Sequence, residues 1–133
     1  MTATTRRPVF DPADVALSLT LPFPPALNHY YRHVGSRVLL SRGGREYRER
    51  VVLYALASGA PFGQPLAGPL AVEITLYRPA RRGDIDGYFK ATFDSLNGIA
   101  WADDSQVVEL HAYRKDDKAN PRAEVRVWPV EGE

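Results

Sequence analysis

Two carboxylates one residue apart, Asp84 and Asp86, lie near the middle of the chain, and Lys90 follows four residues later. A second acidic pair, Asp103 and Asp104, comes after a short helical segment. Mg²⁺ prefers oxygen ligands and usually takes few carboxylates, so that water and substrate phosphate complete its shell. A cation held in this way polarises a phosphate and lowers the pKa of bound water, and a lysine can steady the leaving oxygen. The spacing therefore indicates a metal site suited to phosphodiester chemistry.

The same aspartates also have a purely structural interpretation. From Ile85 onward apolar residues recur at helical spacing, which predicts a helix that ends near Asn97 and Gly98. Acidic residues at its start would suit the positive end of the helix dipole. Lys90 lies four residues from both Asp86 and Asp94 and can form ordinary ion pairs on that helix face. Spacing alone does not decide between capping and catalysis.

A basic and aromatic segment precedes the acidic one. Arginines neutralise phosphates, and tyrosines can stack on exposed bases or wedge into a branch point. The alternative is that one or both of Tyr30 and Tyr31 fill the core beneath a long loop. The residues with side chains suited to DNA contact are Asn28, Tyr30, Tyr31, Arg32, Arg37, Arg42, Arg81 and Arg82.

The two halves of the chain carry opposite charge. Residues 28–82 contain nine arginines against three glutamates, whereas residues 83–133 contain six Lys or Arg against eleven Asp or Glu. A nuclease needs one region to grip phosphate and another to hold cations, and this division would supply both. Clustering of charges on solvated faces would give the same pattern.

The composition excludes several other site chemistries. The chain has 133 residues, which favours one domain, and it has no cysteine, so disulfides, thiolate zinc sites and cysteine nucleophiles are ruled out. Three scattered histidines do not form a zinc pattern. No apolar run approaches the ~20 residues of a membrane span. We expect a cytoplasmic, nucleoid-associated protein with no membrane partner.

Apolar alternation predicts strands at residues 15–21, 70–77, 107–113 and 122–128, and helical spacing predicts helices at about 45–58 and 85–97. Ser41 is the expected N-cap of the first helix. The predicted order is strand-helix-strand-helix-strand-strand. This order indicates a single α/β domain with a small mixed sheet of about four strands and two helices. We expect the last two strands to form a hairpin. Residues 1–14 are expected to be a flexible arm, and residues 15–133 the domain.

Two sequence motifs in this chain resemble those of the RusA-type Holliday-junction resolvases. The first combines Arg81 to Asp86, Lys90, Phe93 to Leu96 and Trp101 to Val108. The second is the stretch from Leu21 to His33, which is similar to that family's N-terminal motif. Both occur in the family's order, and the resemblance covers Val15 to Trp128.

This resemblance implies a homodimeric endonuclease, dependent on Mg²⁺ or Mn²⁺, that binds four-way or other branched DNA. Such enzymes nick two strands symmetrically in DNA recombination and repair. The family's essential carboxylates match Asp84, Asp86 and Asp104, its essential lysine matches Lys90, and Asp103 is an adjacent candidate ligand. The chain departs from the family at Gly87, where asparagine is usual. A broader flap or fork nuclease, or a branched-DNA-binding dimer with impaired catalysis, remain the alternatives.

Overall fold

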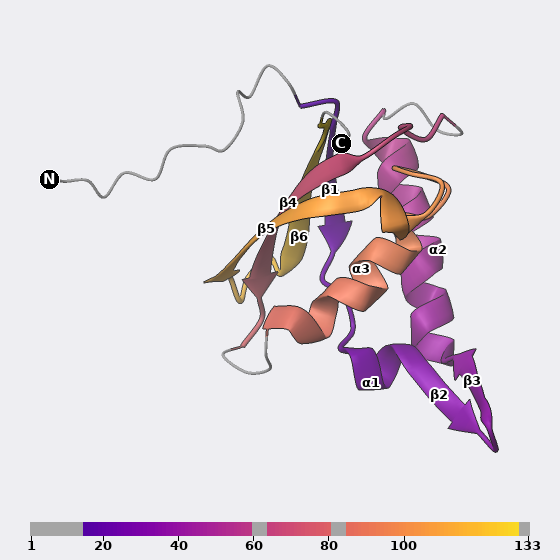
Figure 1. Ribbon diagram of the computed structural model, residues 1–133. Coiled ribbons are helices and arrows are strands. Elements are labelled where there is room, and N and C mark those ends of the chain that lie inside the picture. Colours follow the sequence, from indigo (N-terminus) through magenta and orange to yellow (C-terminus); the bar gives the residue numbers. More distant parts are fainter. Residues whose placement is uncertain (1–14, 60–63, 81–84, 131–133) are drawn as a thin grey trace, which may run out of the picture.

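The computed structural model describes residues 15–59, 64–80 and 85–130, without the side chain of Asp86. The expected arm at residues 1–14, together with Arg81, Arg82 and Asp84, lies outside these ranges. In chain order the elements are β1 (Leu17–Pro22), α1 (Leu27–Tyr30), β2 (Tyr31–Val34), β3 (Arg37–Leu40), α2 (Arg42–Ala57), β4 (Leu70–Arg78), the 3-10 helix η2 (Ile85–Tyr88), α3 (Phe89–Ser95), the 3-10 helix η3 (Asp104–Gln106), β5 (Val107–Asp116) and β6 (Arg122–Pro129) (Figure 1).

The main sheet has four strands in the order β1-β6-β4-β5. Strand β6 is antiparallel to both β1 and β4, whereas β4 and β5 are parallel. The predicted hairpin of the last two strands is therefore wrong, because β4 lies between them. The mostly buried strands β4 and β6 occupy the centre, and the charged, exposed β5 takes an edge, where a charged strand resists pairing with other chains. The predicted α/β domain with a mixed sheet is confirmed.

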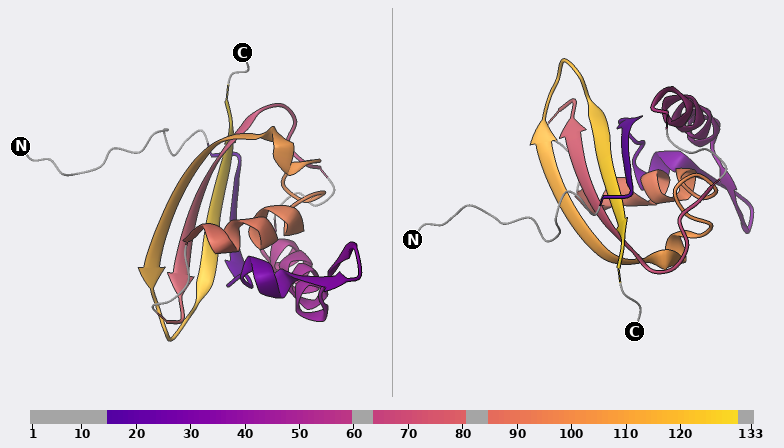
Figure 2. Two further views of the ribbon diagram at one scale, coloured as in Figure 1. Left: turned by 60° about the horizontal axis from the view of Figure 1, so that its bottom comes forward. Right: turned by 90° about the horizontal axis from the view of Figure 1, so that it is seen from above.

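One face of this sheet is covered by helices and the other is open. The alternating apolar residues of β1, β4 and β6 are buried, as predicted, on the face that α2 and α3 cover (Figure 2). Helix α2 contributes Tyr47, Val51 and Ala55 to the same core. The opposite face carries polar side chains from the intervening positions. In the described ranges no helix is both long enough and apolar enough to cross a membrane.

A two-stranded hairpin, β2–β3, replaces the loop that we expected between the first strand and the first long helix. Its arginine, serine and glycine content hides the apolar alternation that marks a strand. The hairpin extends away from the sheet beside the N-terminus of α2 (Figure 1). Ser41 caps that helix as predicted, because its hydroxyl accepts from Gly44 N–H at 2.9 Å. A Cβ at Gly44 would overlap the carbonyl oxygen of Tyr30, so glycine permits this close approach.

The predicted helix from Ile85 is divided into η2 and α3. Aromatic packing fixes η2, since the ring of Tyr88 meets that of Phe23 edge-on at 5.0 Å between centroids. Gly98, with a φ of 86°, follows the helix end as the sequence indicates. The turn that carries Asp86 is thus continuous with the helix that carries Lys90.

Candidate active site

Lys90 and Asp104 come from different elements and meet at one end of the sheet. Lys90 is the second residue of α3, and Asp104 opens η3. The Lys90 Nζ lies 4.0 Å from Asp104 Oδ2, with 48% of the lysine side chain and 27% of the aspartate side chain exposed. Because both groups face water, their attraction is worth at most about 1 kcal/mol. Two predicted catalytic residues are therefore adjacent and accessible to a substrate.

The turn that bears Asp104 is fixed by its neighbours. Asp103 caps η3, since its Oδ1 accepts from Ser105 N–H at 3.3 Å. Gln106 completes the capping box by accepting from the N–H of Asp103 at 3.2 Å. The Gln106 amide also donates to the carbonyls of Leu66 and Gly68, each at 2.9 Å. The turn is thereby tied to the segment before β4, which preorganises Asp104.

A third carboxylate on this side belongs to Asp94, one turn after Lys90 on α3. The hydroxyl of Tyr30 donates to Asp94 Oδ2 at 2.6 Å, and Tyr30 is fully buried. Burial raises the pKa of Tyr30 far above its ordinary value, and the hydrogen bond to the Asp94 carboxylate adds to the rise. Tyr30 therefore remains a donor at any working pH, and it orients Asp94 as an acceptor.

The pKa of Asp104 is raised above its ordinary value. Partial burial is the largest cause, and Asp103 and Asp94 add to it because each brings further negative charge. The ammonium of Lys90 opposes the shift without cancelling it. Carboxylates therefore outnumber cations among the charged neighbours of Asp104.

Carboxylate oxygens are the ligands that a divalent cation such as Mg²⁺ prefers, and the acidic groups around Asp104 are of this kind. Among the residues that the structure describes, no three His, Asp or Glu side chains lie close enough to hold a metal alone. The predicted ligands Asp84 and Asp86 do not enter that comparison, since Asp84 lies outside the described ranges, as does the side chain of Asp86. Asp104 would be a direct ligand, and a bound cation would relieve its unfavourable negative surroundings. Asp103 already has a capping role.

The predicted DNA contacts fall into three groups. Asn28 and Tyr31 lie near η2, around a cavity that also touches Gly87. Arg32, Arg37 and Arg42 are exposed, and Arg42 pairs with Glu46 at 3.4 Å. Arg81 and Arg82 lie outside the described ranges.

Tyr30 differs from the other predicted contacts because its ring is fully buried. Its side chain packs in the core and is not available to stack on a base. The alternative interpretation, in which this tyrosine fills the core, is therefore the one that applies. Tyr31, the next residue, remains partly exposed and meets the Tyr30 ring edge-on at 4.8 Å. The two tyrosines therefore have different roles.

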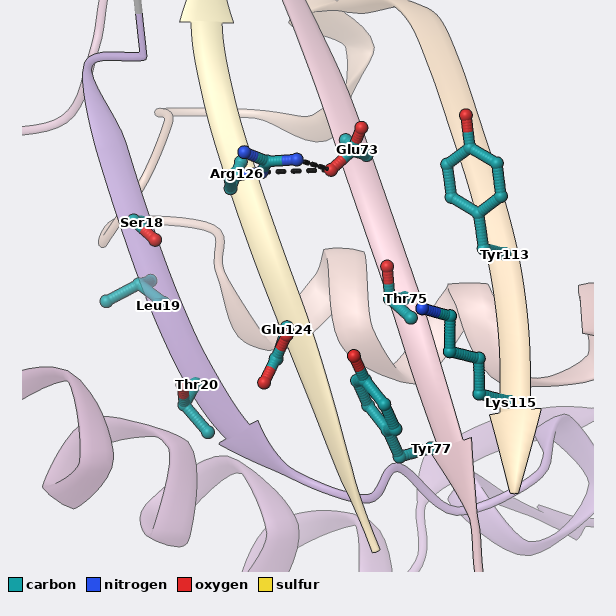
Figure 3. A pocket seen from close by; sticks show the side chains of 10 residues that line it. All are labelled: Ser18, Leu19, Thr20, Glu73, Thr75, Tyr77, Tyr113, Lys115, Glu124 and Arg126. Carbon is teal, nitrogen blue, oxygen red and sulfur yellow. Dashed lines mark hydrogen bonds and ion pairs between the residues drawn. The ribbon is translucent and has the colours of Figure 1, made fainter. Parts of the chain in front are cut away.

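A further cavity, with a volume of about 580 Å³, lies on the open face of the sheet (Figure 3). Its carboxylates already have cationic partners: Glu73 pairs with Arg126, and Glu124 accepts from Arg122 Nε at 2.9 Å. The Arg122 guanidinium also lies over the ring of Tyr77 at 3.7 Å. Size alone would favour this face as the active site, but its neutralised carboxylates are poor cation ligands.

Two features that support the site, the capping box of Gln106 and the contact between Tyr30 and Asp94, were not predicted from the sequence. Gln106 could have been identified, because Asp103 followed three residues later by a glutamine is a capping-box pattern. The contact between Tyr30 and Asp94 joins residues 64 positions apart, and no local pattern signals it. Sequence reasoning instead expected Asp94 to pair with Lys90.

Known proteins resemble this chain over most of its length. The family model described as Endodeoxyribonuclease RusA matches residues 22–128. A crossover junction endodeoxyribonuclease of Enterobacteria phage 82 is 35% identical over 117 residues, covering 86% of this chain and 96% of the relative. The proteins of the same name from Shigella sonnei strain Ss046 and Escherichia coli K12 are each 35% identical over 118 residues, which covers 87% of this chain and 97% of each relative. This chain belongs to the endodeoxyribonuclease RusA family.

Proposed function

We propose that this protein is a Holliday-junction resolvase, dependent on Mg²⁺ with Mn²⁺ as a substitute, that acts as a homodimer in DNA recombination and repair. Two active sites, one from each copy, would make paired symmetric nicks in opposing strands of a four-way junction. The single observation that carries the proposal is the Asp104 and Lys90 pair in an acidic setting, within a chain of the RusA family. The names of the relatives identify them as crossover junction endonucleases.

In this proposal each residue has a chemical task. Asp84, Asp86 and Asp104 would hold the cation, with Asp103 beside them. A bound divalent ion supplies Lewis-acid polarisation of the scissile phosphate and lowers the pKa of its bound water. Lys90 would hold the charged phosphate or the leaving oxygen, since its ammonium is half exposed and fixed near Asp104.

The DNA would be held mainly through its phosphates. Arg32, Arg37 and Arg42 are exposed, and Arg81 and Arg82 come three and two residues before the predicted ligand Asp84. Phosphate-dominated binding releases counterions, so affinity should fall steeply as salt rises. Asn28 and Tyr31 would contact the DNA nearer the cleavage site.

A nicking assay on a synthetic four-way junction, with and without Mg²⁺, tests the proposal. Wild-type protein should make paired nicks only with the metal, and Asp104→Asn should abolish nicking while junction binding persists. Glu124→Gln is a matched control, because it makes the same change at a carboxylate that already has an arginine partner. Nicking by Asp104→Asn at the wild-type rate would contradict the site assignment.

Two further substrates separate the alternatives. A broader flap or fork nuclease would cut a flap or a fork as fast as the junction. Junction binding without any metal-dependent nicking would instead indicate a DNA-binding dimer with impaired catalysis. Gly87, where the family usually has asparagine, would be the first position to examine in that case.

A further inference from the structure

A cavity of about 490 Å³ lies between α1, the hairpin β2–β3 and the η2 turn. Its walls are mainly apolar, with polar groups at two positions. The lining residues are Ala26, Leu27, Asn28, Tyr31, His33, Val38 and Gly87. Leu27 and Val38 are 48% and 56% exposed, so apolar surface faces water here. Exposed apolar surface that is gathered in a cavity is typical of a binding site.

The hairpin has two chemically different faces. Strand pairing places His33 opposite Val38 and Tyr31 opposite Leu40, so these side chains share one face. The cavity is lined from this face. The other face carries Arg32, paired with Leu39, and Arg37, paired with Val34. An element with arginines on one side and an apolar cavity on the other can hold a backbone and a base of the same strand.

The cavity is also connected to the active site. Gly87 belongs to the same turn as Asp86 and lies three residues before Lys90. A Cβ at Gly87 would meet no other atom within 4 Å, so the glycine leaves the space beside it open. On the opposite side, Tyr31 packs against the buried Tyr30, which is hydrogen-bonded to Asp94. A ligand in the cavity would therefore lie beside the turn that carries the predicted ligand Asp86.

We infer that this cavity accepts a single unstacked nucleobase of the DNA substrate, adjacent to the scissile phosphate. This inference rests on the proposed function and identifies how the same site selects its nucleotide. The volume of about 490 Å³ is sufficient for one base. The ring of Tyr31 and the apolar groups of Leu27 and Val38 would contact the faces of the base, and Asn28 and His33 would hydrogen-bond to its edge. Unstacking costs less at a branch point, where the continuous stacking of the duplex is already interrupted.

A fluorescent base analogue tests this inference. Four-way junctions carry 2-aminopurine, whose emission rises on unstacking, at each position beside the crossover. The junctions are saturated with full-length Asp104→Asn protein to prevent cleavage, so differences in affinity do not affect the signal. We expect a several-fold rise in emission at one position, and Val38→Phe in the same background should abolish it by filling the cavity.

Val34→Phe is the matched control, because Val34 is on the same hairpin, is similarly exposed at 47% and faces the other side. It should keep the rise in emission, and Gly87→Asn should reduce it. Equal signals from Val38→Phe and Val34→Phe, or no rise at any position, would overturn the inference. If the wild-type protein still nicks junctions in that case, the proposed function stands. If wild-type protein neither binds nor nicks junctions, both the function and the inference fail.

Discussion

The acidic side chains of this protein lie in two regions with opposite electrostatic surroundings. Around the open face of the sheet, carboxylates are matched by arginines: Glu73 by Arg126, and Glu124 and Asp117 by Arg122. At the α3–η3 end, Asp104 lies near two further carboxylates, Asp94 and Asp103, and its ion pair with Lys90 is long, at 4.0 Å.

The pKa values express this difference. The hydrogen bond from Arg122 lowers the pKa of Asp117 below its ordinary value, whereas burial and neighbouring carboxylates raise that of Asp104. A carboxylate with a lowered pKa is already stabilised by the protein. One with a raised pKa gains most from an added cation. This difference is the reason that we propose the α3–η3 end as the cation site, although the cavity on the open face is larger than the one beside Gly87.

The largest effect is expected on DNA cleavage, when a charged residue of the α3–η3 end is replaced. In the proposed site, Lys90→Ala would remove the cation near the scissile phosphate and should lower the single-turnover nicking rate by about 100-fold. Lys115→Ala is its control, because that ammonium lies on the open face, 5.9 Å from the centroid of the Tyr77 ring. Equal rates for the two variants would show that the position of Lys90 has no special role.

The pH dependence of stability should distinguish the two regions, because the pKa values of Asp104 and Asp117 are shifted in opposite directions. Asp104 has a raised pKa in the fold, so it favours folding when protonated, below its ordinary value of 3.8, and this contribution is lost as pH rises through the raised pKa. Asp117 has a lowered pKa, so its contribution is present above 3.8 and is lost as pH falls through the lowered pKa.

Thermal melts of metal-free protein between pH 2 and pH 8 measure this difference. At neutral pH, Asp104→Asn should melt above the wild type and Asp117→Asn below it, and both differences should shrink in acid. A lower melting temperature for both variants at neutral pH would contradict the assigned surroundings of Asp104.

A smaller effect is expected from Tyr30→Phe. The ring keeps its place in the core, but Asp94 loses its hydrogen bond at 2.6 Å. Stability should fall by about 1 kcal/mol, as is typical for one hydrogen bond. Nicking should decrease only a few-fold, since Asp94 acts through the charge around Asp104. Denaturant titration and the nicking assay measure the two effects, and an unchanged stability would exclude a structural role for this contact.

The sequence predicted the parts of the fold that local patterns determine. Alternation in β1, β4 and β6 identified the buried faces, and the Ser41 cap and Gly98 marked helix ends correctly. The insertion of β6 between β1 and β4 was not predicted, because strand order depends on pairing between distant segments. The hairpin β2–β3 was missed because one face carries arginines and the other lines an open cavity, so it lacks a buried apolar stripe.

The candidate site was predicted to a similar extent. Lys90 and Asp104 were identified from residue types and from the family resemblance, and the fold brings them together. Burial of Tyr30 could not be distinguished from exposure of Tyr31, because adjacent tyrosines look alike in sequence. The excess of negative charge around Asp104 arises because Arg122 and Arg126 pair with carboxylates on the open face of the sheet. That balance is a property of the tertiary structure.

Mn²⁺ binding by the protein alone shows whether Asp104 is a cation ligand. Mn²⁺ titrations followed by electron paramagnetic resonance should be made on wild type, Asp104→Asn and Glu73→Gln, without DNA. We predict that Asp104→Asn weakens Mn²⁺ binding at least about 10-fold, as expected for a lost ligand. Glu73→Gln should leave binding unchanged, because that carboxylate is already paired with Arg126. Wild-type affinity in Asp104→Asn, or a loss of binding in Glu73→Gln alone, would contradict the account.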